Sequence, residues 1–251
     1  MTGQKNLRRR QIAGRDALAA ALKRGATMRI GIRFSRTGRT RFVSHLDMQR
    51  LFARALRRTG IPVKFSQGFN PHIVTSFASA LPVGMETYGD YMEFYIEGEE
   101  KITYIIQRLN EVLPEGIKVL DAGKIEEKAP KLMAASNAAQ VEIICEENEK
   151  KDALISGIEQ ILKSESCICE KKSKGKIRNF DIRPLIFDCK IGGGHIILEL
   201  AHSGAGSLSP YILIEEAKRR ADFEADVRAV RLDLLVQNKN KLASMSEMFI
   251  R

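Results

Sequence analysis

The sequence predicts an α+β protein made of two tandem ferredoxin-like domains, each with the element order β-α-β-β-α-β. First, segments with strand periodicity and segments with helix periodicity follow one another in this order between residues 28 and 123. Second, the same order recurs between residues 138 and 236, although no sequence repeat is visible. Third, about 25 residues separate the second and third strands of the first domain, and this length predicts an insertion there.

The first domain opens with a strand and a helix. The strand is predicted by apolar residues at alternate positions, namely Ile30, Ile32 and Phe34. Ser44 followed by Asp47 is a capping pattern, which predicts a helix from residue 45 to about residue 59. Gly60 ends this helix, and residues 61–65 are expected to form the second strand.

The remaining elements follow from the same periodicities. In the first domain they are a strand at 91–96, a helix at 102–113 and a strand at 117–120. Residues 124–137 are charged and then rich in small residues, so they are predicted to be a linker. In the second domain we expect strands at 141–145, 166–170, 185–190, 195–201 and 230–236, with helices at 154–162 and 209–220. Residues 237–251 are expected to form a loose, polar tail.

The net charge of +10 is concentrated in two segments. Residues 1–27 contain seven Lys or Arg and one acid, and are predicted to be a basic, flexible N-terminal arm. Two alternatives stay open for the arm: contact with nucleic acid, or a dispensable extension before a start at Met28. Residues 29–64 contain ten basic residues and one acid, Asp47. This distribution favours a partner that carries phosphate or carboxylate groups.

The predicted helix at 45–59 is a candidate anion-binding element. Its apolar residues fall on one side, and four arginines fall on the other: Arg50, Arg54, Arg57 and Arg58. No acid follows Asp47 in this helix, whereas a face that is only solvated usually interleaves charges of both signs. We therefore expect these arginines to contact the phosphates of a nucleic acid, here RNA.

The centre of the long insertion is the segment Phe65-Ser66-Gln67-Gly68-Phe69-Asn70-Pro71-His72. Gly68 permits backbone angles that other residues resist, and Asn70 before Pro71 favours a turn. This geometry would direct Gln67, Phe69 and Asn70 toward a ligand. An aromatic side chain beside arginines suits stacking with an unpaired base. The alternative is that Phe69 fills the core beneath the loop.

Two histidines raise the alternative of catalysis. His45 opens the predicted helix, and His72 ends the central segment of the insertion. Metal-free RNA cleavage needs one group to deprotonate the 2′-hydroxyl and another to protonate the leaving oxygen, and two histidines can divide these roles. A capping or core role for His45 is the other interpretation.

The cysteines give no sign of a metal centre. All four lie in the second half and none forms a C-x-x-C pair, so we expect free thiols in a reducing cytoplasm, with no metal and no cofactor. Cys167 and Cys169 share one face of a predicted strand, which leaves a metal or redox pair as the alternative. No apolar run reaches the roughly 20 residues that span a bilayer, and no secretory signal is evident. We expect a cytoplasmic protein without membrane contact.

Several segments resemble a known family. They are Arg41-Phe42-Val43-Ser44-His45-Leu46-Asp47, Arg54-Ala55-Leu56-Arg57-Arg58, Phe65 to Pro71, Ser76-Phe77 and Ala80-Leu81-Pro82-Val83-Gly84. With them the sequence resembles the radical-SAM-linked domain family of unknown function, from about residue 28 to residue 135 and more loosely at 181–186. The resemblance implies a bacterial protein that is encoded beside, or fused to, a radical SAM enzyme. It implies no catalytic residues.

The chain itself lacks a C-x-x-x-C-x-x-C motif, so it cannot hold the radical SAM iron–sulfur cluster. The leading hypothesis is a non-enzymatic, RNA-binding accessory protein that presents a substrate to a radical SAM enzyme. One alternative is a metal-independent endoribonuclease that uses His45. Another is a protein–protein adaptor whose arginine face meets an acidic partner. Architecture-level similarity to CRISPR RNA-processing endoribonucleases does not decide between these functions.

Overall fold

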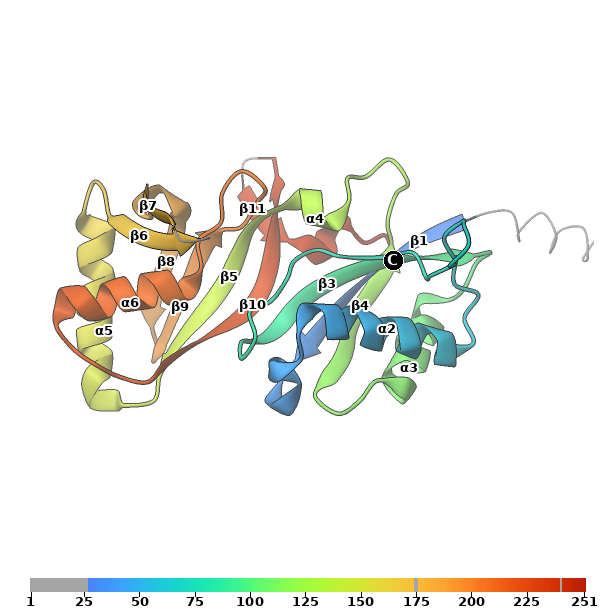
Figure 1. The fold of residues 1–251 in the computed structure, drawn as a ribbon, viewed down its shortest axis with the longest axis horizontal. Helices are drawn as coiled ribbons and strands as arrows, with labels where there is room; N and C mark the ends of the chain where they lie inside the picture. The colour runs from blue at the N-terminus through green and yellow to red at the C-terminus, as the bar shows by residue number, and fades with distance from the viewer. Residues whose placement is uncertain (1–26, 174–175, 240) are drawn as a thin grey trace, which may run out of the picture.

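The computed structural model of this protein describes residues 27–173, 176–239 and 241–251 (Figure 1). Within these residues, nine strands form one mostly antiparallel sheet, whose main path runs β4-β1-β3-β10-β5-β9-β8. The predicted α+β class is confirmed. The two halves of the chain share this sheet because β3 and β10 pair in parallel at its middle, with Val230 opposite Glu86 and Arg231 opposite Thr87.

The first half contains four strands and two long helices. They are β1 (Thr27–Arg36), α2 (His45–Thr59), β2 (Thr75–Phe77), β3 (Glu86–Glu97), α3 (Ile102–Val112) and β4 (Ile117–Lys124). The side chains of β1 that point toward the helices, such as Ile30 and Phe34, are completely buried. The ring of Phe34 lies 4.8 Å from that of Phe52 in α2 and 6.0 Å from that of Phe77 in β2. This apolar layer holds α2 against the sheet.

One segment of the first half differs from the expected strand. Residues 61–65 contribute only isolated bridges, from Val63 to Ile96 and from Phe65 to Ile73. Pro62 lacks the N–H that a continuous ladder requires. A 3-10 turn, η1 (Gly38–Phe42), follows β1 and leads to α2. The buried guanidinium of Arg36 holds this turn through the carbonyl groups of residues 40, 41 and 43.

The second half contains α5 and α6 at one end of the sheet (Figure 1). Its main elements are β5 (Ser136–Cys145), α5 (Asn148–Lys163), β8 (Ile186–Gly192), β9 (His195–Ala201), α6 (Pro210–Ala221) and β10 (Val227–Asn238). The strand expected at 166–170 is β6 (Ile168–Ser173), which pairs with β7 (Lys176–Asp181) in a separate two-stranded sheet. The backbone of 166–170 therefore does not belong to the main sheet.

The C-terminal segment is not the loose tail that its polar composition predicts. It forms β11 (Lys241–Ser244), which pairs with β10, and the 3-10 turn η3 (Met245–Met248). Phe249 is buried, and a Cβ atom at Gly31 would lie only 2.3 Å from its ring. Gly31 of β1 and Gly123 of β4 lie opposite each other in the sheet, and their lack of side chains makes room for this aromatic ring. An apolar anchor hidden in a polar segment is why composition alone gave the wrong expectation.

The expected linker is also ordered. Residues 124–137 carry the short helix α4 (Leu132–Ala135), and Leu132 is buried. The finer prediction of two ferredoxin-like domains with boundaries at 28–123 and 138–236 stays a prediction. No helix in the described part of the chain is long and apolar enough to cross a membrane.

Candidate nucleic-acid interface

Helix α2 begins and ends at the residues that its sequence signals predict. The Ser44 hydroxyl accepts a hydrogen bond from the Asp47 backbone N–H at 3.1 Å and donates one to the Asp47 carboxylate at 2.7 Å. The bond from Ser44 is the main reason that the pKa of Asp47 lies below its usual value. Gly60 adopts φ 74°, which ends the helix. These two caps fix where α2 begins and ends, and the buried side chains of Met48, Phe52 and Leu56 set which side faces the sheet.

The four arginines are exposed, as the periodicity predicts, but their surroundings differ. Arg50 donates to Asp47 at 3.2 Å, and Arg58 donates to the carbonyl oxygen of Val112 at 2.6 Å. Arg54 and Arg57 form no ion pair within the part of the chain that the structure describes. The guanidinium carbon of Arg57 lies 6.0 Å from the centroid of the Phe65 ring. Arg54 and Arg57 are therefore the two members of the face whose charge is available to an anion.

The central segment of the insertion is a hairpin tip, residues 66–72, which we call the 66–72 tip. Ser66 closes it by donating its backbone N–H to the carbonyl oxygen of His72 at 2.8 Å. The Ser66 hydroxyl also accepts the His72 backbone N–H at 3.1 Å and lies 2.9 Å from His72 Nδ1. Gly68 takes φ 124°, a value that favours glycine.

The 66–72 tip holds its side chains away from the protein. Gln67, Phe69 and Asn70 are exposed, and the relative exposure of Phe69 is 106%. The alternative that Phe69 fills the core is therefore wrong. The core position belongs to Ile73, which is 3% exposed and pairs with Phe65. Arg57 and the tip are brought together, because Phe65 contacts Arg57 and leads directly into the tip.

The two histidines are not brought together. His45 lies at the first turn of α2, where its ring packs 5.5 Å from that of Phe77 and its Nε2 lies 3.0 Å from Gln49 Nε2. His72 belongs to the 66–72 tip, near the last turn of α2, which carries Arg57. His45 precedes Arg57 by more than three helical turns, about 18 Å along the axis. One substrate phosphodiester cannot contact both imidazoles in this arrangement.

A buried polar cluster at the junction of the two halves was not anticipated. Arg231 of β10 and Asp90 of β3 are each 4% exposed, and their side chains lie 3.6 Å apart. Burial raises the pKa of Asp90 and lowers that of Arg231, although each charge opposes the effect on the other. Asp90 and Arg231 are far apart in the chain, so no local sequence pattern could have predicted that their side chains meet.

His202 belongs to the same junction. Its Nε2 lies 2.9 Å from the Ser79 hydroxyl, and its Nδ1 lies 2.9 Å from the Ser136 hydroxyl. Burial, with a smaller contribution from Arg231, lowers the pKa of His202 to about 4. The neutral imidazole therefore bridges the segment after β2 to β5, which indicates a structural role.

One group of side chains could hold a metal ion by its ligand types. The Cys167 and Cys169 sulfurs and a Glu216 carboxylate oxygen all lie within 4.8 Å of one another. Burial raises the pKa of Cys167 to about 12, and Arg219 and Arg220 donate hydrogen bonds to the Glu216 carboxylate. Neutral thiols and two guanidinium groups oppose cation binding, so this geometry favours an internal polar network.

These features define an α+β protein with one basic helix face and one exposed aromatic tip. A family model described as "Uncharacterized protein conserved in bacteria (DUF2344)" matches residues 29–210, and the chain belongs to this family. The match includes α2, the 66–72 tip and the whole of β3. No curated protein matches the chain.

Proposed function

We propose that this protein is a non-enzymatic, cytoplasmic RNA-binding accessory protein. The observation that carries the proposal is the complete exposure of Phe69 beside a helix face that has unpaired arginines. Stacking of a base on an aromatic side chain contributes about 1–3 kcal/mol per base. Because a base must be unpaired to stack in this way, the substrate is single-stranded RNA or a loop of structured RNA.

The arginine face supplies the phosphate contacts. Arg54 and Arg57 are the main phosphate ligands, because no acid within the described residues forms an ion pair with them. Arg50, in contrast, forms an ion pair with Asp47. Arg58 keeps one donor on the α3 carboxyl end and has further N–H groups for a phosphate. Gln67 and Asn70 carry amide groups that hydrogen-bond to a base held by Phe69.

The proposed partner is a radical SAM enzyme, to which this protein presents its RNA. The resemblance of residues 28–135 to the radical-SAM-linked domain family is what supports this role. The proposed two ferredoxin-like units are supported by matching strand orders, β4-β1-β3-β2 in the first half and β10-β5-β9-β8 in the second. Such units form an extended platform on which an RNA and an enzyme can bind at separate places.

A protein–protein adaptor is the second candidate, and one observation favours it. Phe42, Leu46 and Val83 are 60%, 55% and 60% exposed. The Phe42 ring lies near Gly84, the neighbour of Val83, and the Arg41 guanidinium lies 4.9 Å from its centroid. Exposed apolar side chains with a basic neighbour suit a protein partner that has an acidic rim.

Salt-dependent RNA binding tests the proposal. The affinity of the full chain for a fluorescent single-stranded RNA is measured by anisotropy at several salt concentrations. Each lost phosphate contact reduces the slope of log K against log salt by about 0.7. Arg54→Glu/Arg57→Glu should lower both the affinity and the slope. The charge-matched control is Lys163→Glu/Lys190→Glu, whose lysines are 76% and 71% exposed and lie on α5 and β8.

The rival functions give different results in the same samples. Equal RNA affinity of the arginine variant and its control would contradict the proposal and favour the adaptor. RNA cleavage in EDTA that disappears in His45→Ala would support the endoribonuclease. Intact RNA after prolonged incubation agrees with a non-enzymatic protein.

A further inference from the structure

The two halves of the chain meet at a polar site that we call the junction site. Its buried part is the pair of Asp90 and Arg231, which are each 4% exposed. Three partly exposed side chains belong to its outer part: Arg41, His45 and Tyr211. In Figure 1, α2 and α6 lie on the two sides of the junction, and the N-terminal end of each helix points toward the middle of the molecule.

Arg231 is a buried cation whose hydrogen-bonding capacity is not used. Its Nε and Nη1 have no hydrogen-bond partner among the described residues. The Asp90 carboxylate lies 3.6 Å from Nη1, a distance too long for a normal hydrogen bond. A buried charged donor without a partner is unfavourable, so an anion near this guanidinium would stabilise the folded protein.

The buried charges around Arg231 do not cancel. Arg36 is 2% exposed, and its guanidinium donates to the carbonyl oxygens of residues 40, 41 and 43. Arg231 and Arg36 both act on Asp90, so two positive groups face one carboxylate and leave a net charge of +1. Thr87, which lies opposite both arginines in the sheet, is completely buried and carries no charge.

The N-terminal end of α6 adds a second source of positive potential. This helix has 12 residues, its N-cap Ser209 makes no side-chain capping bond, and its first turn contains no acid. The aligned peptide dipoles place about +0.5 elementary charge at such an end. α2 contributes less, because Asp47 lies in its first turn and carries the opposite charge.

Electrostatic interactions connect the end of α6 to the buried arginine. Burial raises the pKa of Tyr211, the second residue of α6, and the charge of Arg41 opposes this rise. Burial also lowers the pKa of His202, and the charge of Arg231 adds to that effect. Because His202 follows β9 and leads into the segment before α6, the helix end, Arg41 and Arg231 act on one region.

The amount of positive charge distinguishes between two classes of oxyanion. The buried groups supply +1 and the end of α6 about +0.5, while Arg41 adds a further share that Glu86, at 3.4 Å, partly offsets. A carboxylate carries one negative charge, whereas a phosphate monoester carries about 1.5–2 at pH 7. Phosphate therefore fits this charge better, and helix N-termini and guanidinium groups both bind phosphate.

We infer that the junction site binds a phosphate group, with the first-turn N–H groups of α6 and Arg41 as ligands and Arg231 as the buried countercharge. The site is separate from the arginine face of α2 and from the 66–72 tip, so it does not depend on the proposed RNA binding there. Free phosphate and the terminal phosphate of an RNA both supply this chemistry, and the test below separates them.

Phosphate titration of the full chain, followed by backbone amide NMR at constant ionic strength, tests the inference. Inorganic phosphate should shift the amide signals of Tyr211 and Ile212. Ser209→Asp should weaken binding by about ten-fold or more, because its carboxylate accepts from the first-turn N–H groups in place of phosphate. Ser156→Asp adds the same charge at an exposed position of α5 and is the matched control.

A second variant tests the buried charge. Arg231→Met keeps a long side chain but removes the guanidinium, and it should also weaken phosphate binding. Aspartate is a favoured N-cap residue, so Ser209→Asp should fold and the test should remain decisive even if Arg231→Met does not fold.

Two RNAs of one sequence, with a 5′-phosphate or a 5′-hydroxyl group, identify the source of the phosphate. A preference for the 5′-phosphate RNA that disappears in Ser209→Asp would assign the site to an RNA end. Equal binding of both RNAs, with phosphate-induced shifts that Ser209→Asp abolishes, would assign it to free phosphate. Absence of shifts in the first turn of α6, or equal phosphate affinities of Ser209→Asp and Ser156→Asp, would overturn the inference. Failure of the proposed function would instead appear in Phe69→Ala, which leaves the junction site intact.

Discussion

The buried pair of Arg29 and Glu93 predicts a large loss of stability in Glu93→Gln. Both side chains are at least nine-tenths buried, and the carboxylate accepts hydrogen bonds from Nε and Nη2 of Arg29. The substitution leaves the guanidinium buried beside a neutral amide. Removing one partner of a buried pair costs about 3–5 kcal/mol. The remaining bonds from Arg29 to two carbonyl oxygens place the expected loss near the lower limit, about 3 kcal/mol.

Urea unfolding, followed by circular dichroism, measures this loss. The matched control is Glu97→Gln, which makes the same chemical change at an exposed position of the same strand. Surface substitutions usually change the free energy of unfolding by less than about 0.5 kcal/mol. If Glu93→Gln lowered it by no more than Glu97→Gln does, the ion pair would not be what fastens residues 126–131 to the sheet.

Two further predictions concern the C-terminal segment and the junction of the two halves. Phe249→Ala should lower the free energy of unfolding by about 3 kcal/mol or more, because it opens a cavity beside Gly31. The control, Met133→Ala, removes an exposed side chain and should have little effect on the free energy of unfolding. Equal losses in the two variants would mean that the C-terminal segment does not complete the core. Because the pKa of His202 falls to about 4 in the folded state, stability should be full above about pH 6.5 and decrease as the pH falls toward 4, by up to about 3 kcal/mol. His202→Gln should flatten this part of the profile, and an unchanged profile would contradict the assignment.

Local sequence signals were sufficient to predict the helix that carries the candidate site, α2. Ser44, Asp47 and Gly60 specify the limits of α2 through bonds within a few residues, so the sequence predicted both ends. The arginine face followed from the same periodicity. The contacts of the individual arginines could not be predicted from periodicity. Arg58 donates to the carbonyl oxygen of Val112, and only the packing of α2 against α3 brings these two groups together.

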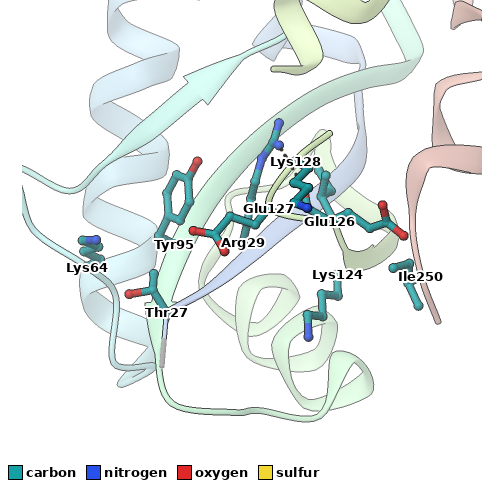
Figure 2. Close-up of a pocket in the computed structure, with 10 residues that line it drawn as sticks. Thr27, Arg29, Lys64, Tyr95, Lys124, Glu126, Glu127, Lys128 and Ile250 are labelled. Carbon is teal, nitrogen blue, oxygen red and sulfur yellow. Dashed lines mark hydrogen bonds between the residues drawn. The ribbon is translucent and has the colours of Figure 1, made fainter. Parts of the chain in front are cut away.

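Long-range packing explains what the sequence could not predict. Gly68 and Pro71 indicated a turn, but not whether Phe69 points into the core or into solvent. Only the folded structure shows that Ile73 takes the core position. The joining of the two halves through β3 and β10 depends on residues that are distant in the chain. The same holds for the pocket lined by Arg29, Tyr95 and Ile250 (Figure 2), whose walls come from β1, β3, β4 and the C-terminal segment.

The most direct test of RNA binding compares Phe69→Ala with the wild-type chain on one RNA sequence, presented as a single strand and as a duplex. Stacking on Phe69 predicts that the substitution weakens single-strand binding by about ten-fold, at roughly 1.4 kcal/mol per stacked base, and leaves duplex binding unchanged. The control is Phe187→Ala, which removes a half-exposed ring from β8. Equal single-strand affinities of Phe69→Ala, Phe187→Ala and the wild type would contradict the central claim.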